Sequence, residues 1–148
     1  MNNLRHLIPY RLLIPLIVSF PLGILEAGEV AVVVNAENSL SSLTPSQVSD
    51  LFLGRSTTFP DGSYVTVIDQ SRASPIRQHF FKGLNGMSLN QVNSYWARLT
   101  FSGRVLPPET AEGSQQVLRR IRENRMAIGY LDAADADASV RIVLRLNL

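Results

Sequence analysis

The chain has no cysteine among its 148 residues. This absence excludes disulfide bonds, thiolate metal sites, a cysteine nucleophile and the lipidated cysteine of bacterial lipoproteins. Histidine is scarce, because only His6 and His79 are present, and the first belongs to an N-terminal segment set aside below. A histidine-rich metal site, or a pair of histidines sharing acid and base roles, is therefore excluded. We expect no enzymatic activity, no metal and no cofactor.

Acidic residues are missing from about one third of the part of the chain that follows the N-terminal segment. The segment 70–108 contains no aspartate or glutamate, but it contains five basic residues, which are Arg72, Arg77, Lys82, Arg98 and Arg104. The preceding segment, 28–69, has the opposite balance, with Arg55 as its only basic residue. A positive, acid-free segment favours an anionic ligand, and solvated arginines on a helix face are the alternative.

The N-terminal residues 1–27 are predicted to form a secretory signal peptide. Basic residues precede an apolar run from Leu12 to Leu25, and this run is interrupted by two prolines and shorter than the about 20 residues of a membrane span. An uncleaved anchor is the alternative. Cleavage after Ala27 would leave residues 28–148, which are enough for one domain. We expect an exported, periplasmic domain without stable membrane insertion.

Segments typical of strands and of helices alternate along residues 28–148. Strands are expected at 30–35, where a β-branched run predicts burial on both faces, and at 64–69, 126–132 and 140–146. Helices are expected to follow the capping residues Thr44, Ser74 and Ser88, and a fourth over 114–124. This alternation predicts an α/β domain, with a mixed sheet flanked by helices in two or three layers.

The junction between a strand and a helix at 69–80, DQSRASPIRQHF, is the strongest candidate for a binding site. Ser74 is predicted to cap the helix, whose first backbone amides and dipole favour an anion. Arg77 falls in the first turn, where a cation is unfavourable unless a negative group is near, and Arg72 precedes the cap. Two guanidinium groups match phosphate, sulfate or carboxylate geometry. An ordinary capped helix is the alternative.

Two other features are candidates with plainer alternatives. Ser39 and Ser41 follow the first strand and would complete the anion shell if its carboxyl end faced the same site, although a flexible polar loop explains them as well. Tyr95 and Trp96 resemble an aromatic binding shelf, but their helical spacing with Val92 favours packing in the core.

The segments VVVN, LTPSQVSDLFLGRSTTFPDG, SPIRQHFF and AIGY occur in an order that resembles the phosphate-binding periplasmic proteins of ABC phosphate transporters, especially their short relatives. The resemblance implies a single lobe of the periplasmic-binding-protein-like fold. It also implies capture of phosphate or another oxyanion for ABC-type uptake or sensing.

In that family a serine-glycine-threonine at a helix start, preceded by an arginine and an aspartate, holds the phosphate. Alignment on Phe80 places Ser74 at the family's serine, and Pro75 and Ile76 at its glycine and threonine. The upstream arginine position falls on Gln70. Only Ser74 is retained, so Arg72 and Arg77 are the candidates to replace the missing ligands.

The expected partners follow from this resemblance and from the size of the domain. A single lobe leaves an anion half exposed to water, so binding is expected to be weak unless a transporter membrane component, a second lobe or a second protomer completes the cleft. No nucleic-acid partner is expected. The rival hypothesis is a periplasmic interaction module that has lost ligand binding and contacts another protein through its basic surface.

Overall fold

The computed structural model describes residues 28–103 and 105–147, and the predicted signal peptide lies outside these ranges. A single five-stranded sheet has the order β3-β2-β4-β1-β5. Its strands are β1 (Val30–Asn35), β2 (Thr66–Gln70), β3 (Glu109–Ala111), β4 (Ala127–Asp132) and β5 (Val140–Leu146). Strand β1 is antiparallel to β4 and β5, whereas β2 is parallel to β3 and β4. The mixed sheet confirms the predicted fold class.

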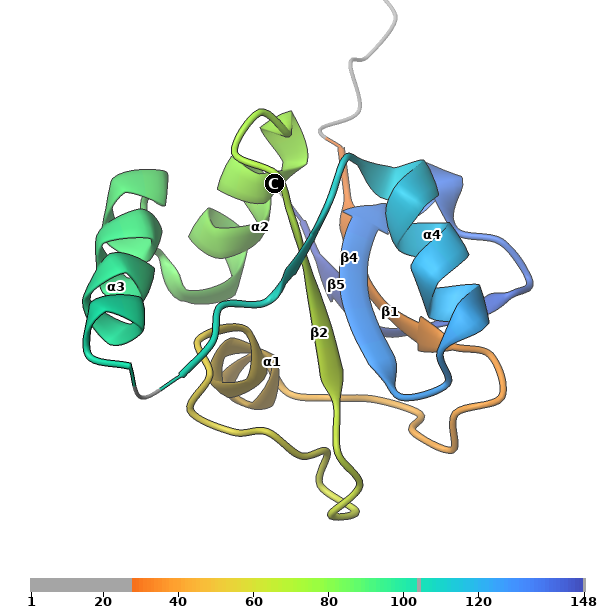
Figure 1. The fold of residues 1–148 in the computed structure, drawn as a ribbon. Helices are drawn as coiled ribbons and strands as arrows, with labels where there is room; N and C mark the ends of the chain where they lie inside the picture. The colour runs from red at the N-terminus through yellow and green to blue at the C-terminus, as the bar shows by residue number, and fades with distance from the viewer. Residues whose placement is uncertain (1–27, 104, 148) are drawn as a thin grey trace, which may run out of the picture.

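The helices form layers on both faces of the sheet (Figure 1). They are α1 (Pro45–Phe52), α2 (Pro75–Asn85), α3 (Leu89–Phe101) and α4 (Ser114–Glu123). Val32 of β1 belongs to the core cluster shared with α1, α2 and α3, and its neighbour Val33 belongs to the cluster under α4. Both residues are fully buried, so β1 is covered on both faces, as the β-branched run predicts.

Local sequence explains most helix ends. Thr44 and Ser88 each accept a hydrogen bond from the third residue of their helix, and the side chain of that glutamine bonds back to the cap. Helix α2 ends at Gly86, which adopts the left-handed conformation with φ of 73° that glycine favours. Within the described ranges, no helix combines the length and apolar composition needed to cross a membrane.

Strand direction decides which loops meet. We call the end of the sheet where β2 stops and α2 begins, residues 69–74, the β2 rim. Since β1 runs antiparallel to β4, and β4 runs parallel to β2, the loop after β1 lies at the opposite end of the sheet (Figure 1). We call this opposite end, residues 35–41, the β1 rim.

Candidate anion-binding site

A buried ion pair lies at the β2 rim. The Nε and Nη2 atoms of Arg77 each lie 3.0 Å from Oδ2 of Asp69. The other carboxylate oxygen, Oδ1, accepts hydrogen bonds from the Tyr130 hydroxyl at 2.6 Å and from the Gln70 backbone amide at 2.8 Å. Burial and the adjacent Asp69 raise the pKa of Tyr130, so its phenol stays protonated and keeps donating. Protein donors therefore occupy both oxygens of Asp69.

Each guanidinium nitrogen of Arg77 has an acceptor within the protein. Its Nη1 atom donates to Oδ1 of Asn93 at 3.0 Å, and its guanidinium carbon lies 5.3 Å from the ring centroid of Phe81. The side chain is buried, and Asp69 is the negative group that offsets a cation in the first turn of α2. Asp69 therefore balances the charge of Arg77 within the protein, and the expected contact of Arg77 with an anion stays a prediction.

Ser74 occupies the N-cap position of α2 but does not cap the helix with its side chain. Its hydroxyl donates to Oε1 of Gln70, and Nε2 of Gln70 donates to the Tyr130 carbonyl at 2.8 Å. The serine therefore satisfies a buried glutamine at the end of β2. The expected role of the Ser74 hydroxyl at an anion is corrected for this reason.

Ser39 and Ser41 are exposed residues of the β1 rim. The antiparallel direction of β1 places them at the end of the sheet opposite the start of α2. The structure does not bring them together with Arg72, Ser74 or Arg77, so the expectation that they complete the same shell is corrected. That expectation assumed that β1 and β2 end on the same side.

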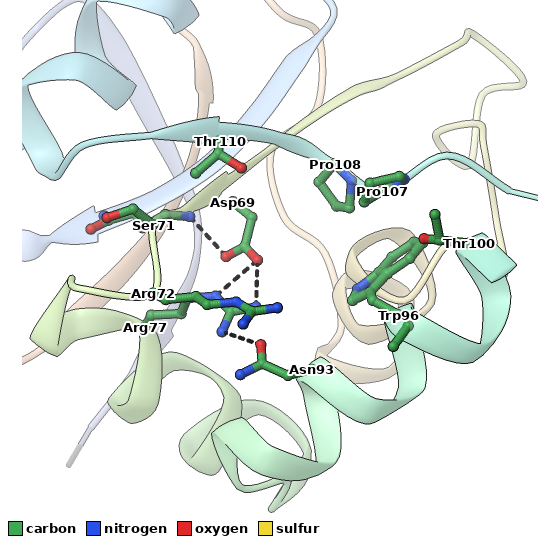
Figure 2. A pocket seen from close by; sticks show the side chains of 12 residues that line it. Asp69, Ser71, Arg72, Arg77, Asn93, Trp96, Thr100, Pro107, Pro108 and Thr110 are labelled. Carbon is green, nitrogen blue, oxygen red and sulfur yellow. Dashed lines mark hydrogen bonds and ion pairs between the residues drawn. The ribbon is translucent and has the colours of Figure 1, made fainter.

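A cavity of about 320 Å³ opens between the β2 rim and α3 (Figure 2). Its polar side is lined by Asp69, Arg72, Arg77 and Asn93, and its apolar side by Trp96, Ala97 and the pair Pro107 and Pro108. Among residues 28–103 and 105–147, no group of three or more histidine, cysteine, aspartate or glutamate side chains is placed to hold a metal. The chemistry of the lining therefore favours an anionic or polar solute.

Arg72 differs from the other charged residues of this cavity. It is exposed, and no acidic side chain among the described residues forms an ion pair with it. Figure 2 shows its side chain extending from the β2 rim toward α3. Since Asp69 and Arg77 neutralise each other, Arg72 leaves the lining with a formal charge of about +1 at neutral pH. Of the five residues predicted for the site, Arg72 is the one whose charge is available to a ligand.

One face of α3 forms the opposite wall. Asn93, Trp96, Ala97 and Thr100 line the cavity and recur at the spacing of one helical face. Trp96 is 7% exposed and belongs to the core, which confirms the packing interpretation, but it also faces the cavity. Sequence reasoning missed this wall. Its signal was the presence of polar Asn93 and Thr100 on a helix face that includes a tryptophan.

Comparisons with known proteins find no matching family model and no matching curated protein. Solved structures do match. A structure from Clostridium perfringens, described as a phosphate ABC transporter substrate-binding protein with bound phosphate, superposes with a TM-score of 0.64 at 20% identity. The match covers 80% of this chain and 46% of that one. This chain has the fold of one lobe of a periplasmic binding protein.

Other periplasmic binding proteins give the same result. An ABC-type phosphate transport receptor from Vibrio cholerae matches with a TM-score of 0.61 at 18% identity, covering 78% of this chain and 45% of that one. PstS from Borrelia burgdorferi matches with a TM-score of 0.60 at 9% identity, covering 78% and 46%. The chain thus spans less than half the length of these structures. Likeness at such identities extends to the fold alone.

Proposed function

We propose that this protein is an exported, periplasmic solute-binding domain without enzymatic activity. It captures phosphate or another small oxyanion reversibly, for ABC-type uptake or for sensing. The observation that carries the proposal is Arg72, an exposed cation without an acidic partner among the described residues, on the wall of a cavity at the β2 rim. The Clostridium perfringens structure, which was solved with bound phosphate and of which this fold covers 46%, supports it.

In the proposed mechanism, the two arginines have different roles. Arg72 donates its planar fork to the oxyanion. Arg77 acts indirectly, because its bond to Oδ1 of Asn93 holds that side chain in the cavity wall. Asp69 takes no part in contacting the anion, since its oxygens already accept from protein donors.

The affinity proposed for this domain alone is weak. The cavity is partly open to solvent, and a solute bound there keeps part of its hydration. A transporter membrane component, a second lobe or a second protomer placed over the cavity would raise the affinity by adding donors. The predicted signal peptide at 1–27 agrees with the proposed periplasmic location.

Calorimetry tests the proposal. Phosphate, sulfate and a dicarboxylate are titrated into the purified protein and into Arg72→Gln, and Arg119→Gln serves as the matched control because Arg119 is an exposed arginine of α4. We expect Arg72→Gln to weaken binding of the preferred anion by about tenfold or more, which corresponds to loss of a charge-assisted hydrogen bond. Absence of heat at millimolar anion, or equal affinities in the two variants, would contradict the proposal.

A second candidate function, protein contact, is favoured by two exposed apolar side chains, one at the end of α3 and one just before Pro107. Phe101 is 96% exposed and Leu106 is 86% exposed, and Leu106 adjoins the pair Pro107 and Pro108 of the cavity wall. Exposed large apolar side chains of this kind mark contact surfaces when they cluster. Pull-down from an envelope fraction tests this candidate. Loss of a specific partner on Phe101→Ser with Leu106→Ser, and with charge reversal at Arg72, would support it.

A further inference from the structure

We infer that the preferred ligand is an organic oxyanion with a second hydrogen-bond acceptor, and that the indole N–H of Trp96 donates to this acceptor. The inference rests on the proposed function, because Arg72 would hold the anionic group. It deepens that function by naming the class of solute. Inorganic phosphate would then be a partial ligand that uses one end of the cavity.

The Trp96 indole nitrogen is the first observation. Within residues 28–103 and 105–147 it is the single buried side-chain nitrogen or oxygen without a hydrogen-bond partner. Buried polar groups are nearly always paired, because an unpaired donor forfeits its bond to water without replacement. The other buried polar groups of the β2 rim follow this rule, including both oxygens of Asp69. The exception therefore requires a reason.

The orientation of the ring supplies one. Figure 2 shows the indole nitrogen on the edge of the ring that faces the two arginines. The six-membered part of the ring packs so closely on Gly54 that a Cβ atom at position 54 would lie 2.8 Å from the Trp96 ring. Tyr95 adds an edge contact, with ring centroids 5.7 Å apart. The ring is thus held in place, and its N–H is directed to the cavity side.

The dimensions and lining of the cavity agree with a solute larger than phosphate. About 320 Å³ lies at the lower end of the range for sites that take small organic molecules, roughly 300–1,000 Å³. The anionic end would lie at Arg72, and Ala97, Pro107 and Pro108 offer apolar surface to a carbon skeleton. An acceptor on that skeleton would meet Trp96.

Access to the indole nitrogen requires a small rearrangement. The atom is shielded from solvent, so an acceptor reaches it only after a side chain at the cavity wall has moved. Arg72 is exposed and has no acidic partner among the described residues, so it is suited to shift on binding. Binding should therefore change the environment of Trp96, which is the chain's only tryptophan.

A matched pair of ligands provides the test on the unmodified protein. We would titrate inorganic phosphate, 2-methylpropylphosphonate and 2-oxopropylphosphonate. The last two differ at the second carbon, where the ketone has a carbonyl oxygen in place of a methyl group. Calorimetry gives the affinities, and the single indole N–H resonance in ¹⁵N-labelled protein reports on Trp96. We expect the ketone to bind about five-fold tighter than the alkyl analogue, as one added hydrogen bond allows. The indole proton should shift downfield with the ketone only.

Two further titrations separate the possible failures. Trp96→Phe keeps an aromatic ring and removes the donor, so it should abolish the preference for the ketone. If the two phosphonates bind the unmodified protein equally and the indole resonance does not respond, the inference is overturned, whatever the fate of the variant. Phosphate binding that depends on Arg72 would then still support the proposed function. If no anion binds, both are overturned.

Discussion

The two rims of the sheet both carry buried polar residues, but they differ in what lies beside these residues. At the β1 rim, Asn35 donates to the Ile121 carbonyl at 2.8 Å and accepts from the Glu37 amide at 2.9 Å. Asn38 donates to the Arg125 carbonyl in the same manner, and Arg125 is ion-paired with Glu37. The polar groups of the β1 rim thus bond to α4 and to the loop after it.

In the described part of the chain, the β2 rim and the cavity walls beside it contain some polar groups with hydrogen-bond partners and others without. Asp69, Gln70 and Arg77 bond to one another or to Tyr130, as the asparagines of the β1 rim bond to nearby backbone. Arg72 and the Trp96 indole have no such partner among the described residues, and both line one cavity. Polar composition alone therefore does not indicate a binding site. The candidate site is indicated by Arg72 and the Trp96 indole, two groups unpaired within the described ranges that line the same cavity.

The largest effect on stability is expected when the buried ion pair between Arg77 and Asp69 is broken. Arg77→Met strips Asp69 of its buried partner and should lower the free energy of unfolding by about 3–5 kcal/mol. Denaturant unfolding measures this loss, with Arg119→Met on α4 as a surface control expected within about 0.5 kcal/mol of the unmodified protein. A loss below about 1 kcal/mol would mean that the pair is not structural.

A smaller effect is expected from Tyr130→Phe. The substitution removes one donor from the buried Asp69 carboxylate and should cost about 2 kcal/mol in denaturant unfolding. Since the pKa of Tyr130 is raised, its phenol is neutral throughout the neutral range, and the loss should be the same at about pH 6 and about pH 9. A loss that shrinks toward the higher pH would contradict this protonation state.

At the β1 rim, Asn35→Ala should lower stability by about 1–2 kcal/mol, because the Ile121 carbonyl and the Glu37 amide lose their partner. Calorimetry with phosphate should give an unchanged affinity for this variant. A loss of stability with unchanged phosphate affinity would show that Asn35 has a structural role and no role in binding. Weakened phosphate binding in Asn35→Ala would indicate that the β1 rim takes part in binding, which would contradict the proposed site.

The smallest effect on stability is expected at Arg72. Its exposed side chain has no acidic partner among the described residues, so Arg72→Gln should change the free energy of unfolding by less than about 0.5 kcal/mol. The same variant should lose about tenfold in phosphate affinity. Ser41→Ala should change neither quantity. Destabilisation of Arg72→Gln by more than about 1 kcal/mol would show that Arg72 has a structural partner.

Local features of the fold could be predicted from the sequence. The capping boxes at Thr44 and Ser88 involve residues three apart, so neighbours in the chain decide them. The β-branched run of β1 likewise predicts a strand buried on both faces. The resemblance to phosphate-binding proteins added the fold of a single lobe, and the solved structures confirm it.

The site was less predictable because its contacts are distant in the chain. Ser74 has the correct position for a cap, but the buried Gln70 side chain competes for its hydroxyl. Ser39 and Ser41 follow a strand, but strand direction, which a single sequence does not reveal, places them at the other rim. Trp96 has the spacing of a core residue, and only its unpaired nitrogen marks a second role.

A phosphate titration, followed by the backbone amide resonances of the ¹⁵N-labelled protein, tests most directly whether the anion binds between the β2 rim and α3. We expect chemical-shift changes to concentrate at Ser71 and Arg72 of the β2 rim and at Asn93 on α3, while Ser39 and Ser41 at the β1 rim stay unchanged. Shifts centred on the β1 rim, or no shift at millimolar phosphate, would contradict the proposed site.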